Sequence, residues 1–151
     1  MTDKKEERII TPEQRRAKEA WGETEGLTGD RAGDFANQCK QTSVRILNSG
    51  ILPTLAFLHA HGRAGGDEAD QTGPAGQTKR CADALAHWLI CFVEEKPSEG
   101  GVKTVLEKMI KKDDVALLRR VQTEALAYLH WLARLAEGRS IESDSKGGGA
   151  S

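Results

Sequence analysis

The feature that most constrains the fold of this chain is residues 115–136, which place apolar side chains on two sides of one predicted helix. At helical spacing they form two rows, the first being Val115, Leu118, Val121, Ala125, Leu129 and Leu132 and the second Leu117, Tyr128, Trp131 and Leu135. A helix on a protein surface needs only one apolar stripe, so two rows must be covered by neighbours on both sides. The sequence therefore predicts that this helix is central to a bundle, is capped by Asp113 or Asp114, and ends near Ala136.

Two earlier segments also carry helix signals. Thr11 is a suitable N-cap and Pro12 suits the first helical position, which predicts a first helix. The glycine-rich, acidic residues 22–34 are expected to form a loop. From Asp34 onward, apolar positions recur at helical spacing and predict an amphipathic helix whose stripe is Phe35, Cys39, Thr42, Ile46 and Leu47.

Residues 48–62, NSGILPTLAFLHAHG, are the least polar stretch of a chain that is otherwise 30% charged. Gly50 can end the preceding helix in a left-handed conformation, and Pro53 suits the opening turn of another helix. We therefore expect an α-hairpin around Gly50. Its second arm has hardly any polar side and should be enclosed by neighbours, because of Leu52, Leu55, Ala56, Phe57 and Leu58.

The remaining segments complete an all-α fold. Residues 62–78 have loop composition and predict a long connection. A helix follows with Cys81, Leu85, Trp88, Leu89 and Phe92 on one face, and the sequence PSEGG breaks it. Residues 102–112 predict a short helix with an apolar face of Val102, Val105, Leu106, Met109 and Ile110. We expect one domain over residues 11–138, a bundle of about five or six helices, with flexible tails at 1–10 and 139–151.

The bulk composition excludes several classes of protein. The formal net charge is −1, so no strong overall attraction to nucleic acid or acidic membranes is expected. The three cysteines are odd in number and widely spaced, which favours free thiols in a reducing cytoplasm. The N-terminus has no apolar signal region and no apolar run reaches membrane-spanning length, so a cytoplasmic protein is predicted.

No set of residues predicts catalysis, a metal or a cofactor. His59 and His61 are two positions apart and would point to different sides of a helix. His87 and His130 are each explained by a partly buried imidazole bonded to a neighbouring helix, and Cys91 lies in an apolar pattern without a cationic neighbour. The glycine-containing loops lack nucleotide-binding motifs. A Cys–His hydrolase stays open as an alternative but nothing in the sequence favours it.

Basic residues are unevenly distributed along the chain. Residues 102–136 contain seven Lys or Arg against four Asp or Glu, whereas residues 21–34 contain one against four. Solvated helix faces explain most such residues. The alternative is a shared basic face that meets phosphates. Its candidates are Arg16, Lys18, Lys40, Arg45, Lys111, Lys112, Arg119, Arg120 and Arg134.

Four segments in this order resemble a known family. They are RRAKEA at 15–20, the turn SGI running into LPTLAFL at 49–58, HWL at 87–89, and EALAYLHWLARLAEG at 124–138. Over residues 12–138 the chain is similar to the small subunit of the CRISPR type III-B RAMP module (Cmr) effector complex. It departs from the usual family pattern at Ser49, where the family usually has Asn, and at Ala133, where Lys is common.

The resemblance implies a non-catalytic helical subunit of a cytoplasmic prokaryotic defence complex. Copies would stack as an inner filament beside the backbone RAMP subunits that hold guide RNA, would reach the polymerase-like large subunit, and would line the path of target RNA. The basic faces would then neutralise phosphates without reading bases. Arg16, Lys18, Lys40, Arg45 and Arg134 are the first candidates because they lie in the segments that carry the likeness. The competing hypothesis is a helical protein-interaction module with no role in nucleic-acid binding.

Overall fold

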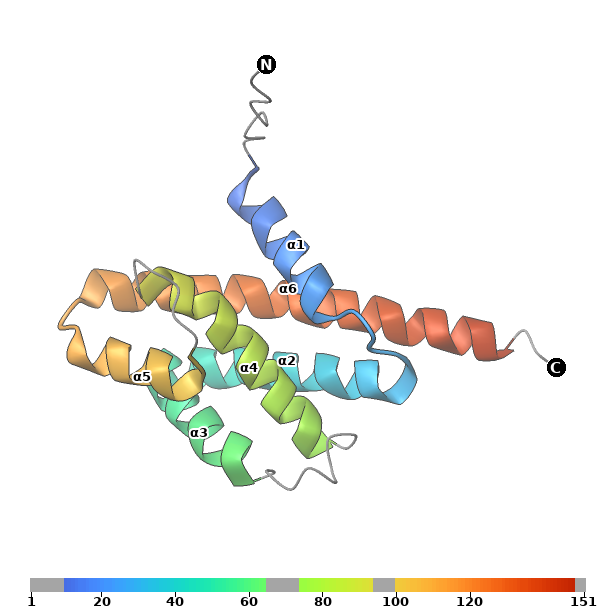
Figure 1. The fold of residues 1–151 in the computed structure, drawn as a ribbon, viewed down its shortest axis with the longest axis horizontal. Coiled ribbons are helices and arrows are strands. Elements are labelled where there is room, and N and C mark those ends of the chain that lie inside the picture. The colour runs from blue at the N-terminus through green and yellow to red at the C-terminus, as the bar shows by residue number, and fades with distance from the viewer. Residues whose placement is uncertain (1–9, 65–73, 94–99, 149–151) are drawn as a thin grey trace, which may run out of the picture.

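The described part of the chain is helical throughout. A computed structural model describes residues 10–64, 74–93 and 100–148, and within these ranges it contains helices and no strand (Figure 1). The helices are α1 (Pro12–Glu23), α2 (Gly29–Ser49), α3 (Ile51–Ala64), α4 (Pro74–Val93), α5 (Val102–Lys111) and α6 (Val115–Gly148). The predicted all-α bundle is therefore confirmed.

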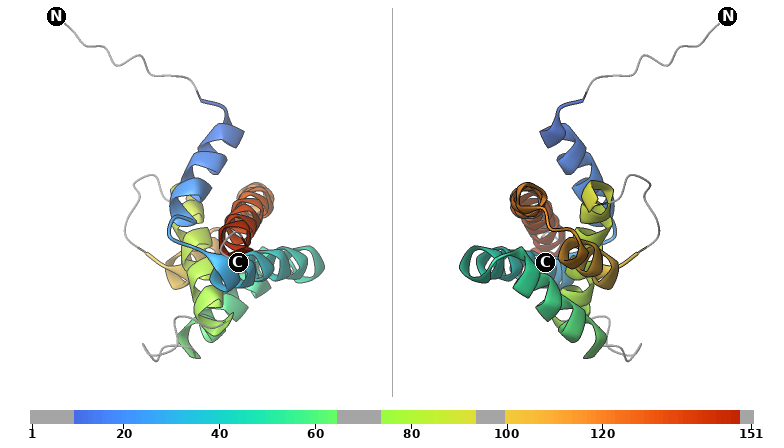
Figure 2. Two further views of the ribbon diagram at one scale, coloured as in Figure 1. Left: turned by 90° about the vertical axis from the view of Figure 1, so that its right-hand side faces the viewer. Right: turned by 90° about the vertical axis from the view of Figure 1, so that its left-hand side faces the viewer.

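Helix α6 is the element around which the others pack. It contacts α1, α2, α3 and α4, and it runs beside α2 for much of the molecule (Figures 1 and 2). Seven of its described side chains are buried in the core: Val121, Ala125, Tyr128, Leu129, Leu132, Ala133 and Ala136. The prediction of a central helix is confirmed, although Val115 in the first turn is 64% exposed. Asp114 is the cap, since its Oδ1 accepts a hydrogen bond from the Leu117 amide at 3.0 Å.

Helix α6 ends at Gly148, well beyond the predicted end at Ala136. Arg139 lies in this extension, and its side chain reaches back to the C-terminal end of α1. Its Nε donates to Thr24 Oγ1 at 3.1 Å, and its guanidinium lies over the Trp21 ring at 4.6 Å. Contacts made by one long polar side chain leave no apolar periodicity in the sequence.

The first two helices begin largely as their signals indicate, with one correction. Thr11 forms a reciprocal capping box with Gln14 at the start of α1. The predicted loop over residues 22–34 is too long, because α2 already begins at Gly29. Leu27 and Ala32 are both buried, so this stretch contributes to the core despite its glycines.

The apolar stripe of α2 is confirmed at four positions and wrong at the fifth. Phe35, Cys39, Thr42 and Ile46 are buried, whereas Leu47 is 68% exposed. Leu47 is displaced from Ile46 by about 100° around the helix, which turns its side chain out of the stripe.

The α-hairpin around Gly50 is confirmed. Gly50 has φ 89° and ψ 169°, and its amide donates to the carbonyl oxygen of Ile46 at 2.8 Å. The next amide, of Ile51, donates to Gln122 Oε1 at 3.1 Å, which joins the turn to α6. The second arm, α3, is less enclosed than expected: Leu55 and Leu58 are buried, but Ala56 is exposed.

Helices α4 and α5 complete the core. Cys81, Leu85, Trp88 and Leu89 of α4 are buried, as are Val102, Val105 and Met109 of α5. Ile110 is 60% exposed, against its prediction as a core residue.

The connections around α4 differ from their predicted extents. The predicted loop at 62–78 is shortened by α3 and α4, and its central residues, 65–73, lie outside the described residues. The same holds for most of the PSEGG break and for residues 1–9 of the predicted N-terminal tail. Among the described helices, none is long and apolar enough to cross a membrane.

Replacing Gly50 with Ala should lower the free energy of unfolding by about 1–3 kcal/mol, measured by urea denaturation. The backbone at Gly50 occupies a region that is essentially restricted to glycine, so a Cβ there causes strain. The nearest atom to that Cβ would be Gln122 Oε1 at 3.8 Å, an ordinary contact, so the cost is conformational rather than steric.

The matched control is Gly138→Ala on the exposed side of α6, where nothing lies within 4 Å of the added Cβ. Ala is favoured over Gly inside a helix, so this variant should be neutral or stabilised by up to about 1 kcal/mol. Equal stability of the two variants would show that the turn does not depend on glycine.

Candidate nucleic-acid interface

Two of the predicted cationic residues line one groove between α2 and α6. The groove has a volume of about 610 Å³ and includes Lys40 and Val44 from α2 and Leu126, His130 and Arg134 from α6. Lys40 and Arg134 are exposed and lie on opposite walls. The fold thus brings together two cations that are far apart in sequence, along an open channel with an apolar floor.

Each of these two cations already has a neighbour within the molecule. Lys40 forms an ion pair with Glu137 of α6, in which both side chains are largely open to solvent. Arg134 Nε donates to His130 Nε2 at 3.0 Å, one helical turn earlier. His130 is exposed and bonds within its own helix, so the expectation of a partly buried imidazole bonded to a neighbouring helix is wrong.

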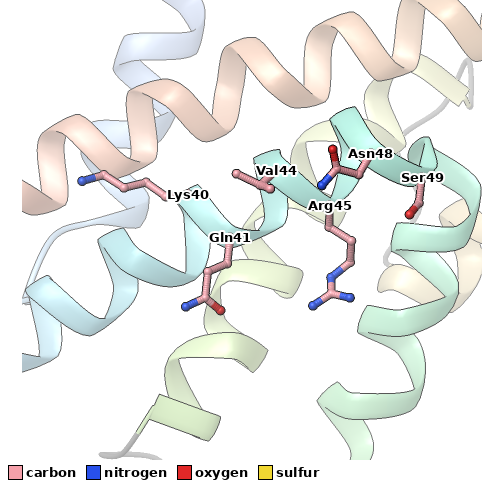
Figure 3. Close-up of a pocket in the computed structure, with 6 residues that line it drawn as sticks. All are labelled: Lys40, Gln41, Val44, Arg45, Asn48 and Ser49. Carbon is pink, nitrogen blue, oxygen red and sulfur yellow. The ribbon is translucent and has the colours of Figure 1, made fainter.

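A second hollow, of about 460 Å³, lies on α2 next to the groove (Figure 3). Lys40 and Val44 line both hollows, and Arg45 lines only the second. In Figure 3 the Arg45 side chain points from α2 towards α3, and the Lys40 side chain points away from α3. The Arg45 guanidinium lies 3.5 Å from the centroid of the Phe57 ring, a cation–π contact that fixes its position.

The remaining candidates lie apart from this groove in two groups. On α1, Arg16 turns into the protein and Lys18 is exposed. Near the turn between α5 and α6, Lys112 Nζ donates to the carbonyl oxygen of Val93 at 2.6 Å, and Arg120 lies over the Phe92 ring at 5.5 Å. The last two members of this second group, Lys111 and Arg119, are exposed.

Arg16 forms a two-pronged ion pair with Glu124 of α6, an interaction that the sequence analysis did not identify. Its Nε and Nη2 donate to the two carboxylate oxygens at 2.9 and 2.5 Å. The side chains are only 20% and 15% exposed. The hydrogen bond from Arg16 lowers the pKa of Glu124, and the same bond raises the pKa of Arg16. The pair therefore fastens α1 to α6.

The cysteines do not form the arrangement that a thiol hydrolase requires. Cys39 and Cys81 are buried with their Sγ atoms 3.5 Å apart, and burial raises the pKa of Cys39. Cys91 is exposed rather than packed in the core, and its thiol donates to the backbone carbonyl of His87 at 3.9 Å. Within the described residues, these thiols hydrogen-bond with one another, with the Thr42 hydroxyl and with a backbone carbonyl, and not with an imidazole.

The family model described as CRISPR-associated protein (Cas_Cmr5) matches residues 12–139 of the chain. This span begins at the first residue of α1 and includes the groove between α2 and α6. No curated protein matches the chain.

Replacing Glu124 with Gln should lower the free energy of unfolding near neutral pH by about 1–3 kcal/mol, because it removes a charge-assisted hydrogen bond to a poorly exposed Arg16. The pKa of Glu124 is lower in the folded protein than its usual 4.5. The contribution of ionised Glu124 to stability is therefore fully present above the unfolded-state pKa of 4.5. It is lost as the pH falls through the lower pKa of the folded state.

Urea denaturation from pH 7 down to pH 2 provides the measurement. The wild-type chain should lose stability on acidification more steeply than Glu124→Gln. The control is Glu107→Gln, which removes a carboxylate that is exposed on α5. Parallel pH profiles for wild type and Glu124→Gln would contradict the assignment.

Proposed function

The chain belongs to the Cas_Cmr5 family of CRISPR-associated proteins, the small subunit of the type III-B Cmr complex, and from this premise we propose that it is a non-catalytic subunit that contacts target-RNA phosphates. The observation that carries the proposal is the groove of about 610 Å³ between α2 and α6, with Lys40 and Arg134 on its two walls. Family membership makes it a component of a multi-protein complex. The RNA contact and the structural role are the proposal.

The chemistry of the groove suits a phosphate backbone rather than bases. Lys and Arg contacts to phosphate depend on charge and carry no sequence information. Lys40 can exchange its partner, because an exposed ion pair such as Lys40–Glu137 contributes only about 0–1 kcal/mol. A phosphate that replaces Glu137 would also release counterions from the RNA, which favours binding at low salt.

The other candidates differ in how free they are to meet RNA. Arg45 extends the groove along α2, with its guanidinium held by Phe57. Lys18 is exposed on α1, and the second group, Lys111, Lys112, Arg119 and Arg120, is on another part of the surface. Arg16 is the weakest candidate, since Glu124 already binds two of its nitrogens. We therefore propose Lys40, Arg45 and Arg134 as the main contacts.

The proposed RNA contact is of use to the complex when several copies of the chain act together. One copy contributes few phosphate contacts and should bind RNA weakly, so binding becomes useful when several copies line one strand. We propose stacking of copies as an inner filament, beside the backbone RAMP subunits with the guide RNA and next to the polymerase-like large subunit. RNA cleavage and second-messenger synthesis would belong to other subunits.

A second candidate function is a protein-interaction module that does not touch RNA. The observation that favours it is the exposure of large apolar side chains on α2, where Val44 is 55% and Leu47 is 68% exposed. A partner helix that covered these residues would also close the groove. Charge reversal in the groove distinguishes the two functions, because it should affect RNA retention under the first and complex assembly under the second.

The double variant Lys40→Glu, Arg134→Glu should weaken retention of target RNA by the assembled complex. Each lost single-strand phosphate contact should also reduce the slope of log affinity against log salt by about 0.7. Filter binding of labelled RNA over a range of salt concentrations measures both effects, with assembly checked by native mass spectrometry.

The charge-matched control is Arg15→Glu, Lys103→Glu, which reverses two exposed cations outside the groove. This control should bind RNA as wild type does. If the groove variant assembles normally and retains RNA with an unchanged salt slope, the RNA contact is elsewhere. Loss of assembly with unchanged RNA binding by the free chain would favour the protein-interaction module.

A further inference from the structure

Three potential metal ligands converge where α1 lies against α4. Glu19 and Glu23 are one turn apart on α1, and His87 faces them from α4. His87 Nδ1 lies 3.1 Å from Glu23 Oε1 and 3.8 Å from Glu19 Oε1. The ligand atoms of all three residues lie within 4.8 Å of one another.

The distances are close to what one small cation requires. Zinc bonds of about 2.0–2.1 Å to nitrogen and oxygen place two ligands of a tetrahedron about 3.3 Å apart. The two separations from the imidazole are already near this value. The widest separation must shrink by at most about 1.5 Å, which the flexible side chains of Glu19 and Glu23 allow. Both carboxylates are partly buried, which limits the positions that they sample.

The ligand set itself, two carboxylates and one imidazole, is negatively charged when the imidazole is neutral. Within the described residues, the ion pairs of Glu19 and Glu23 are both made with His87. The nearby Arg80 guanidinium instead donates to the backbone carbonyl oxygens of Glu23 and Glu25, at 3.1 and 3.2 Å. Arg31, Lys79 and Arg80 line one hollow together with Glu23 and Asp83, so Glu23 also borders on cationic side chains.

The carboxylates of the site act on two neighbouring groups. The pKa of Asp83, one turn before His87 on α4, is raised by burial, and Lys79 lowers it by more than Glu23 raises it. The Tyr128 hydroxyl is buried and has no hydrogen-bond partner among the described residues. Its pKa is raised by burial and then by the charges of Glu23 and Glu19. A bound cation would offset the charge of Glu19 and Glu23.

We propose that Glu19, Glu23 and His87 form a binding site for a divalent transition metal of the Zn²⁺ type. One imidazole and two carboxylates favour zinc over magnesium, which prefers an octahedral set of oxygens and keeps its water. Water completes the coordination, and the metal ties α1 to α4 beside the Arg16–Glu124 pair that ties α1 to α6. This site differs from the sequence-based expectation of no metal.

The test is isothermal titration of the metal-free full-length chain with Zn²⁺ alone, together with thermal unfolding. Wild type should bind one ion with micromolar or tighter affinity, and its Tm should rise with Zn²⁺ concentration, as expected for a ligand of the folded state. His87→Gln and Glu23→Gln should each weaken binding about tenfold or more and abolish the Tm shift. Asp83→Asn, which alters only the surrounding charge, should have a smaller effect.

The matched control is His61→Gln, which removes another exposed imidazole, on α3, far along the chain from the site. It should bind Zn²⁺ as wild type does, and Mg²⁺ at the same concentration should not compete. Circular dichroism shows that each variant is folded. The proposal is overturned if wild type and His87→Gln bind Zn²⁺ equally, or if His61→Gln loses as much binding as His87→Gln. It is also overturned if wild type does not bind at 100-micromolar Zn²⁺, or if it binds Mg²⁺ as tightly as Zn²⁺.

Discussion

The burial of α6 on two sides is the constraint on which the rest of the structure depends. A helix with two apolar rows cannot rest on one neighbour, so α2 packs along one side and α1 and α4 meet the other (Figure 2). Near its middle, the Tyr128 ring stacks on Trp88 of α4 with centroids 4.9 Å apart. Aromatic packing of this kind adds about 0.5–1.5 kcal/mol to the gain from burial.

Polar contacts then fix the positions of the elements that α6 holds only loosely. Helix α1 has Ala20 as its buried residue, so its apolar contact with the bundle is small. It is instead attached at separate points by Arg16 to Glu124, by Arg139 to Thr24, and by Glu23 to His87. Similarly, Gln122 joins the turn at Gly50 to α6 through the Ile51 amide. Directional contacts give α1 a defined orientation that its short apolar face would not specify.

The sequence predicted features that depend on local chemistry and missed those that depend on distant neighbours. The cap at Thr11, the glycine turn at Gly50 and the two apolar rows of α6 follow from helix geometry within one segment. The exposure of Leu47 and the extension of α6 past Ala136 depend on which surfaces other helices cover.

The candidate sites show the same division. Lys40 and Arg134 were selected for charge and family likeness, but only the packing of α2 on α6 places them in one groove. The i, i+4 spacing of Glu19 and Glu23 is visible in the sequence. Their contact with His87 is not, because Glu23 and His87 are 64 positions apart. Arg16 carries the same charge as Lys40, and its partner Glu124 is 108 positions away. Composition therefore cannot separate a cation that is available to RNA from one that is already paired.

If the chain binds RNA as proposed, the segregation of its charge would give it a preferred orientation towards the strand. With a net charge of −1, long-range attraction is weak, so the local arrangement of charge decides which face approaches a phosphate backbone. The groove between α2 and α6 presents Lys40 and Arg134, whereas the junction of α1 and α4 presents Glu19, Glu23 and Asp83. Under the proposed function, an RNA strand would be attracted by the first surface and repelled by the carboxylates of the second. Because a divalent cation at the junction would reduce this repulsion, occupancy of that site would lower the electrostatic contrast between the two surfaces while it strengthens the attachment of α1.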